Sequence, residues 1–173
     1  MIIRPSIVTL LTMALLSFLF GCSKSGQAGP AKLEFAELLP AESAQLEQQR
    51  GVVGSTVKQR YGITALTKTK EDLPVLQRLL DDRVFSKTQT YELQCLGVAF
   101  GDVLASELPL RWMMVTDSFG TDPTLRYKDS TIQVSSLTMI SKRVEEGRGA
   151  NLSDLMEGVR SSLKKMIDSG QYK

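Results

Sequence analysis

The chain has 173 residues, a length that suits one ordinary domain rather than two. The net charge is +2 with 23% charged residues, which excludes a strongly basic nucleic-acid surface and an acidic tail. The sequence contains two cysteines and no histidine. These counts exclude Ser-His-Asp and Cys-His hydrolases, histidine-ligated zinc and a four-cysteine zinc site.

Residues 1–21 have the pattern of a secretory signal. Arg4 is the only charged side chain in this segment, and an apolar run extends from Ile7 to Phe20. The run is short for a membrane span, which needs roughly 20 apolar residues. We therefore expect a signal peptide, with an uncleaved anchor helix as the alternative.

The end of this segment, Leu19-Phe20-Gly21-Cys22, resembles a bacterial lipobox. The resemblance implies cleavage between Gly21 and Cys22, attachment of diacylglycerol to the Cys22 sulfur, and acylation of the new amino group by a chain such as palmitate. Several acyl chains hold a protein at a membrane firmly, whereas a single chain holds it weakly. Ser23 follows the acceptor, and in Gram-negative lipoproteins this favours the outer membrane. The expected location is the outer membrane, lipid-anchored and facing the periplasm.

The rest of the chain divides into a tether and one domain. Ser23 to Lys32 is rich in Ser, Gly, Ala and Pro, so it cannot bury enough apolar surface to offset its ordering entropy. We assign residues 22–39 to the lipidated cysteine and a flexible tether, with ordered structure beginning near Leu33 or Pro40. Residues 40–173 are expected to form a single domain.

Hydrophobic periodicity predicts an α+β domain. Three helices are expected first, over about 41–61, 72–82 and 90–107. Three strands follow: one that ends near 117, one over 124–128 and one over 132–135. A helical or turn segment over 138–146 and a helix from 151 onwards complete the prediction. Residues 118–123 are expected to form a loop. The expected architecture is about four helices packed on a small three-stranded antiparallel sheet.

The helix predicted over 90–107 is apolar on nearly all sides, as expected at the centre of a domain. Gly97 and Gly101 are four residues apart and therefore share one face. Each glycine costs about 1 kcal/mol of helix propensity relative to alanine. We therefore expect this face to admit the close approach of another backbone.

Several blocks of the sequence resemble one bacterial family. The blocks are the run Leu96–Asp102, Trp112, Asp117 with Gly120, and the run Ser136–Glu145. In this order they resemble a domain of unknown function, DUF3806, that occurs in Gram-negative lipoproteins and cytosolic proteins. The resemblance covers roughly residues 63–167. It implies a small α+β domain and carries no established activity.

Asp102 is the first candidate for a functional side chain, because it lies in the predicted central helix. A buried carboxylate must be paired, hydrogen-bonded or directed into a cleft. The structural interpretation is an ion pair with Lys142, Arg143 or Arg111, and the functional one is an acid, base or anchor in a pocket. We group Asp102, Asp117, Lys142 and Arg143 as a candidate polar cluster.

The other candidates have ordinary structural explanations. Asp117 and Asp122 flank a Gly- and Pro-containing loop, where aspartate commonly forms turns. Trp112 is expected in the core rather than on a stacking surface. Cys95 lies in the apolar helix without a histidine partner, so it is expected to be a buried and inert thiol.

These observations favour a lipid-anchored, periplasm-facing binding or protein-interaction module of the bacterial envelope, and weigh against an enzyme. The expected partners are the membrane, through lipid on Cys22, and an envelope protein or peptidoglycan. No cofactor, metal or nucleic acid is expected. The alternative is a carboxylate-based cell-wall glycan hydrolase that uses Asp102 and Asp117.

Overall fold

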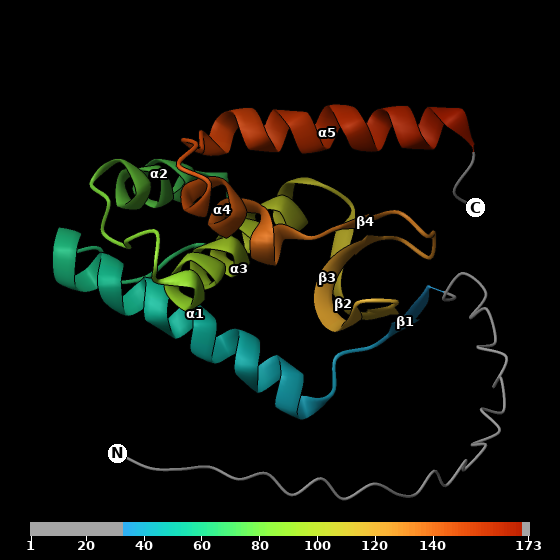
Figure 1. Ribbon diagram of the computed structural model, residues 1–173, viewed down its shortest axis with the longest axis horizontal. Helices are drawn as coiled ribbons and strands as arrows, with labels where there is room; N and C mark the ends of the chain where they lie inside the picture. Colours follow the sequence, from blue (N-terminus) through green and yellow to red (C-terminus); the bar gives the residue numbers. More distant parts are fainter. Residues whose placement is uncertain (1–32, 171–173) are drawn as a thin grey trace, which may run out of the picture.

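Five helices and four strands make up the part of the chain that the computed structural model describes, residues 33–170 (Figure 1). The helices are α1 (Pro40–Tyr61), α2 (Leu73–Asp81), α3 (Thr90–Glu107), α4 (Ser136–Glu145) and α5 (Leu152–Ser169), with one 3-10 turn, Lys70–Asp72, before α2. The strands are β1 (Glu34–Ala36), β2 (Leu110–Asp117), β3 (Gly120–Tyr127) and β4 (Gln133–Val134). The expected signal segment, the Gly21–Cys22 lipobox and the stretch Ser23 to Lys32 lie outside the described residues. Within residues 33–170, no helix is both long enough and apolar enough to cross a membrane.

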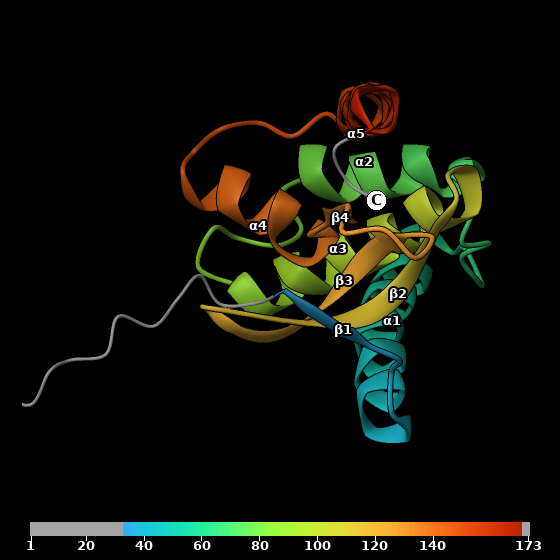
Figure 2. The ribbon, with the colours of Figure 1, turned by 90° about the vertical axis from the view of Figure 1, so that its right-hand side faces the viewer.

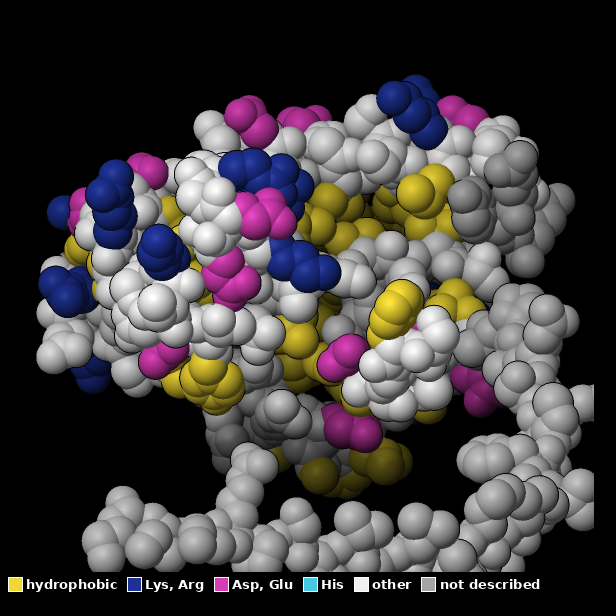
Figure 3. All heavy atoms as spheres, viewed as in Figure 1, with side chains coloured by type: hydrophobic (Ala, Val, Ile, Leu, Met, Phe, Trp, Pro, Cys, Tyr) yellow, Lys and Arg dark blue, Asp and Glu magenta, His cyan; other side chains and the backbone are white. Residues whose placement is uncertain are grey.

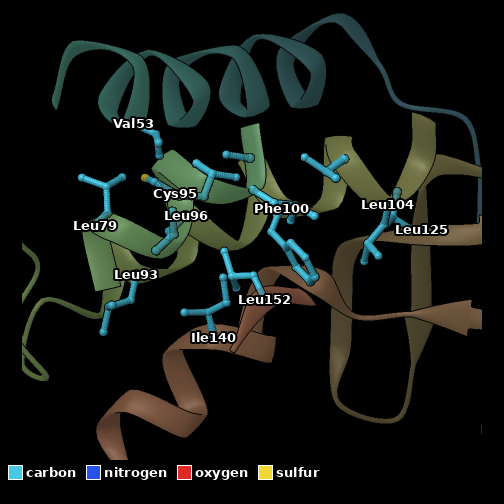
Figure 4. Packing of buried hydrophobic residues seen from close by; sticks show 14 of the residues in the cluster. Val53, Leu79, Leu93, Cys95, Leu96, Phe100, Leu104, Leu125, Ile140 and Leu152 are labelled. Carbon is cyan, nitrogen blue, oxygen red and sulfur yellow. The ribbon is translucent and has the colours of Figure 1, made fainter. Parts of the chain in front are cut away.

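Helix α3 runs through the middle of the fold (Figures 1 and 2). It packs against α1 on one side and against α4 on the other, and its end leads into the sheet. Its side chains are buried almost continuously from Leu93 to Leu104, as its all-round apolar sequence predicts. In the core, Phe100 lies near Ile140 of α4 and Leu152 of α5 (Figure 4).

Gly97 and Gly101 allow the start of α4 to contact α3 directly. A Cβ atom at Gly97 would lie 2.6 Å from the Ser136 carbonyl oxygen and closer still to that of Leu137. A Cβ atom at Gly101 would lie 2.5 Å from both the Ser136 hydroxyl and the Trp112 ring. The close approach expected from the spacing of these glycines is therefore confirmed.

The sheet is antiparallel throughout, in the order β1-β2-β3-β4. The mixed α+β class is confirmed, but the expected counts of about four helices and three strands are each one too low. Strand β1 pairs Glu34 with Thr116 and Ala36 with Met114. It lies inside the segment 22–39 that was expected to be tether. A three-residue strand is too short to show a period of two, so only its pairing with β2 defines it.

Two further segments differ from the sequence prediction. Residues 136–145 form the complete helix α4 rather than a short helical or turn segment. Strand β3 begins at Gly120, although residues 118–123 were expected to form a loop. Pro123 fits in this strand because β4 pairs only with Leu125 and Arg126 of β3. Within residues 33–170, no strand therefore pairs with the second edge of β3 at Pro123.

We predict that Gly97→Ala destabilises the fold by about 1–3 kcal/mol, because the added methyl group would press on backbone atoms of α4. The control is Gly51→Ala in α1, where a Cβ atom would meet nothing within 4 Å. This control should stabilise the protein by about 0.5–1 kcal/mol through helix propensity. Urea denaturation measures both changes, and equal effects of the two substitutions would contradict the close contact.

Candidate functional site

The four residues of the candidate polar cluster lie in three separate places. Asp102 is buried on α3, Asp117 is the last residue of β2, and Lys142 and Arg143 belong to α4. Within residues 33–170, no hydrogen bond or salt bridge joins any of these three places to another. Each place therefore needs its own explanation.

Asp102 is held by two side chains from other elements. The Arg50 guanidinium on α1 donates through Nε to Oδ2 at 2.6 Å and through Nη2 to Oδ1 at 2.7 Å. The Trp112 indole N–H on β2 donates to Oδ1 at 2.9 Å. Only 8% of the Asp102 side chain is exposed, and its hydrogen bonds raise the pKa of Arg50 above its ordinary value. The forked geometry makes this a strong, charge-assisted pair that ties α1, α3 and β2 together.

The ion pair expected at Asp102 exists, but each of its expected partners was wrong. Arg111 pairs on the exposed sheet surface with Glu37 at 2.8 Å and Asp129 at 3.1 Å. Lys142 and Arg143 belong to α4, where they line a separate groove. The true partner, Arg50, lies 52 positions upstream on α1. The packed face of this helix is marked by its buried residues Leu46, Gln49, Val53 and Val57.

Asp117 forms a turn, as the sequence suggested. Its Oδ1 accepts the Phe119 backbone N–H at 2.7 Å, at the tip of the β2–β3 hairpin. Trp112, which contacts Asp102, lies five residues earlier on β2. That spacing places the two side chains about 16 Å apart along the strand and on opposite faces of the sheet. Asp117 and Asp102 therefore do not share a site.

A small hollow of about 240 Å³ opens beside the Arg50–Asp102 pair. Its charged groups already bind one another. Glu47 accepts from Arg50 at 2.9 Å and lies 3.6 Å from the Lys68 ammonium. The Asp72 carboxylate accepts the Lys68 backbone N–H at 2.7 Å and so holds a residue with a positive φ of 62°. The charged side chains around this hollow therefore form a structural network in which they satisfy one another, rather than a binding site.

A groove of about 580 Å³ lies between α5, α4 and β4, and we call it the α5 groove. Figure 3 shows a hollow beneath α5 with hydrophobic side chains on its floor and basic side chains beside it. The floor consists of half-buried apolar side chains from all three elements. These are Val134, Met139, Leu155, Val159 and Met166. Its volume lies within the range typical of ligand sites, about 300–1,000 Å³.

The α5 groove is lined by three basic residues, Lys142, Arg143 and Arg148, and by two acidic ones, Glu146 and Asp154, so the excess is one positive charge. Lys142 is exposed, and Arg143 donates only to the Met139 carbonyl oxygen at 2.6 Å. Among residues 33–170, no carboxylate lies within salt-bridge distance of either side chain, whereas Arg148 pairs with Glu146. The rim therefore offers two cations that are free to meet an anionic group.

The sheet contributes its edge to the same groove. β4 is the last strand in the sheet order, and β3 is its only strand partner in the described part of the chain. The side-chain oxygen of Gln133 is buried without a hydrogen-bond partner in that same part. A buried acceptor without a donor is costly, and Gln133 is one of the residues that line the groove.

Cys95 is fully buried in α3, and burial raises the pKa of its thiol. Its sulfur lies on the side of α3 that faces Val53 of α1 (Figure 4). The expectation of a buried thiol is confirmed. Among the described residues, no cluster of three or more carboxylate or cysteine side chains is arranged to bind a metal ion.

Comparison with known proteins agrees with this architecture. The described residues define a small α+β domain, and residues 72–155 match the family model described as "Domain of unknown function (DUF3806)". This match supports the family resemblance over that segment. The segment holds α2, α3, β2 to β4, α4 and the first turn of α5, but leaves out α1 and therefore Arg50.

One solved structure shows the same fold. It is the crystal structure of a protein from Bacteroides thetaiotaomicron VPI-5482, with a TM-score of 0.68 and 20% sequence identity. The similarity covers 77% of this chain and 49% of that one, so the chain spans about half the length of its structural relative. At this identity the likeness concerns the fold alone. No curated protein matches the sequence.

We predict that Asp102→Asn destabilises the protein by about 3 kcal/mol, because it removes the buried counter-charge of Arg50 and leaves only the exposed Glu47. Asparagine can still accept the Trp112 N–H, so the loss reports mainly on the ion pair. Asp129→Asn, at the 90% exposed end of the Arg111 pair, is the matched control and should leave the unfolding midpoint near that of wild type. A small effect of Asp102→Asn in urea denaturation would contradict the structural role.

We also predict that Cys95 resists alkylation in the folded protein and reacts after unfolding. The thiolate is the reactive form, and both burial and the raised pKa disfavour it. Iodoacetamide labelling at pH 8 with and without urea, followed by peptide mass spectrometry, distinguishes Cys95 from Cys22. Rapid labelling of Cys95 in the absence of urea would show that α3 opens readily.

Proposed function

We propose that this protein is a lipid-anchored binding module of the bacterial envelope, held at the outer membrane and facing the periplasm. The α5 groove is the observation that carries the binding role. It combines an apolar floor with two rim cations, Lys142 and Arg143, that have no carboxylate partner among residues 33–170. Such a surface suits the holding of a partner rather than chemistry on it.

The two carboxylates considered for catalysis already accept structural hydrogen bonds. Asp102 accepts hydrogen bonds from Arg50 and Trp112, and Asp117 accepts from the Phe119 backbone. A general acid and base need to flank one substrate bond. No observation favours the alternative of a glycan hydrolase that uses this pair, so binding is the function that we propose.

The anchor in this proposal is Cys22, at the end of the lipobox-like sequence. Strand β1 begins at Glu34, twelve residues later. A fully extended chain of that length reaches at most about 40 Å. The proposed anchor would therefore keep the domain, and with it the α5 groove, close to the membrane surface.

An envelope protein is a better partner for the α5 groove than peptidoglycan. The floor side chains are aliphatic and thioether groups, and their burial is most favourable against apolar surface. Glycan strands offer mainly hydroxyl and amide groups, which would have to be desolvated against that floor. Peptidoglycan remains the second partner of the proposal, and binding to isolated sacculi would identify it.

We predict that cells fed a radioactive or alkyne-labelled palmitate incorporate the label into the wild-type protein and not into Cys22→Ala. The variant should also leave the outer-membrane fraction, because it lacks the acyl chains that hold it there. Cys95→Ala is the matched control and should retain the label. Labelling of Cys22→Ala, or a wild-type protein that never takes up label, would refute the anchor.

The binding role has its own measurement. A lysine-reactive crosslinker applied to intact cells should join the wild-type protein to a small set of envelope proteins. Recovery of the uncrosslinked monomer alone would argue against a protein partner.

A further inference from the structure

We infer that the α5 groove binds an extended acidic and apolar segment of a partner protein, which adds as a strand to the free edge of β4. The inference deepens the proposed function and rests on it for the existence of a protein partner. Four features of the groove lead to this ligand: the strand edge, the unpaired acceptor, the rim cations and the apolar floor.

The lining of the groove shows that β4 presents its edge. Both residues of β4, Gln133 and Val134, line the groove, and so do Ile132 and Ser135, which flank the strand. Side chains of consecutive strand residues point to opposite faces, so a single face would contribute only every second residue. The edge of the strand therefore meets the groove, and an edge without a strand partner can accept an extended peptide through backbone hydrogen bonds.

The unpaired acceptor favours a peptide over a simple amphiphile. The Gln133 side-chain oxygen is buried and has no partner among residues 33–170, so the side chain has to turn for this oxygen to meet a donor in the groove. A peptide backbone supplies N–H donors at regular intervals along the edge. An ionised fatty acid has no donor, so it would leave this oxygen unpaired.

The charges on the rim specify an acidic segment. Lys142 and Arg143 have no carboxylate within salt-bridge distance in the described part of the chain. Asp or Glu side chains of the partner would supply the missing charges, with the planar Arg143 group suited to a carboxylate. A basic segment would meet these cations with repulsion.

The floor of the groove specifies apolar side chains in alternation with the acidic ones. The two methionines, Met139 and Met166, are flexible and can repack around different apolar groups. The part of α5 that lines the groove, from Asp154 to Met166, is about 18 Å long, which matches an extended segment of about six residues. The expected ligand therefore alternates apolar and acidic residues over about this length.

The test uses a hexapeptide of alternating leucine and glutamate that carries a photoreactive group and biotin. The peptide is added to the fraction of a cell lysate that contains the full chain, and the mixture is then illuminated. We expect saturable labelling that mass spectrometry maps to residues 132–166. Lys142→Glu combined with Arg143→Glu should raise the half-saturating peptide concentration about tenfold.

Three controls make the result specific. Lys164→Glu with Lys165→Glu changes the net charge of the protein by the same amount, at exposed positions outside the groove, and should bind like wild type. A leucine–lysine hexapeptide should label weakly. A peptide that is N-methylated at every second residue lacks the donors of one edge and should also label weakly. Thermal unfolding of each variant verifies that the fold is intact.

Three results would overturn the inference. The first is that labelling does not saturate up to about 1 mM peptide. The others are that the N-methylated peptide labels equally well, or that the label maps outside the groove. Competition by sodium palmitate, with no effect of N-methylation, would instead identify a site for anionic amphiphiles. Palmitate labelling at Cys22 and crosslinking in intact cells do not depend on how a partner binds the groove, as an added strand or otherwise. If both of these experiments succeed and the peptide test fails, the strand-addition inference is rejected and the proposed function stands.

Discussion

The contact between α3 and the start of α4, made without side chains at Gly97 and Gly101, is the constraint on which the rest of the domain depends. Any Cβ atom at Gly97 would overlap the backbone of Ser136 and Leu137. Because the two backbones touch, α4 lies directly against the central helix, and Ile140 reaches the core near Phe100 (Figure 4). The cost in helix propensity at two positions is offset by close packing at the centre of the fold.

The same glycine face fixes the polar centre of the protein. Gly101 leaves room for the Trp112 ring, and the next residue, Asp102, accepts the indole N–H. Arg50 then approaches the other side of the carboxylate from α1. One buried carboxylate therefore sets the position of α1, α3 and β2 relative to one another. A pair of this kind imposes geometry, because an unpaired partner would be strongly destabilising.

The α5 groove results from the way in which the last helix is attached. Leu152 and Leu163 are its only buried side chains, and Gln77 of α2 accepts the Leu152 backbone N–H at 2.8 Å. Between these points the apolar stripe of α5 faces α4 and β4 with its side chains half covered. Because α5 is held only at its start and at one later residue, its apolar stripe is not fully covered. The hollow beside it is therefore lined by apolar side chains and open to a partner.

Local patterns were sufficient to predict four of the five helices and the close contact at Gly97. Periodicities of 3.6 and two residues span whole elements, and the penalty of a helical glycine is visible without knowing its neighbour. The same patterns predicted a buried Cys95 and a paired Asp102. They could not show that Arg50, 52 positions away, is the partner, nor that Lys142 and Arg143 line a groove with α5. Strand β1 and the site depend on contacts between segments distant in the chain, and tertiary packing alone brings those segments together.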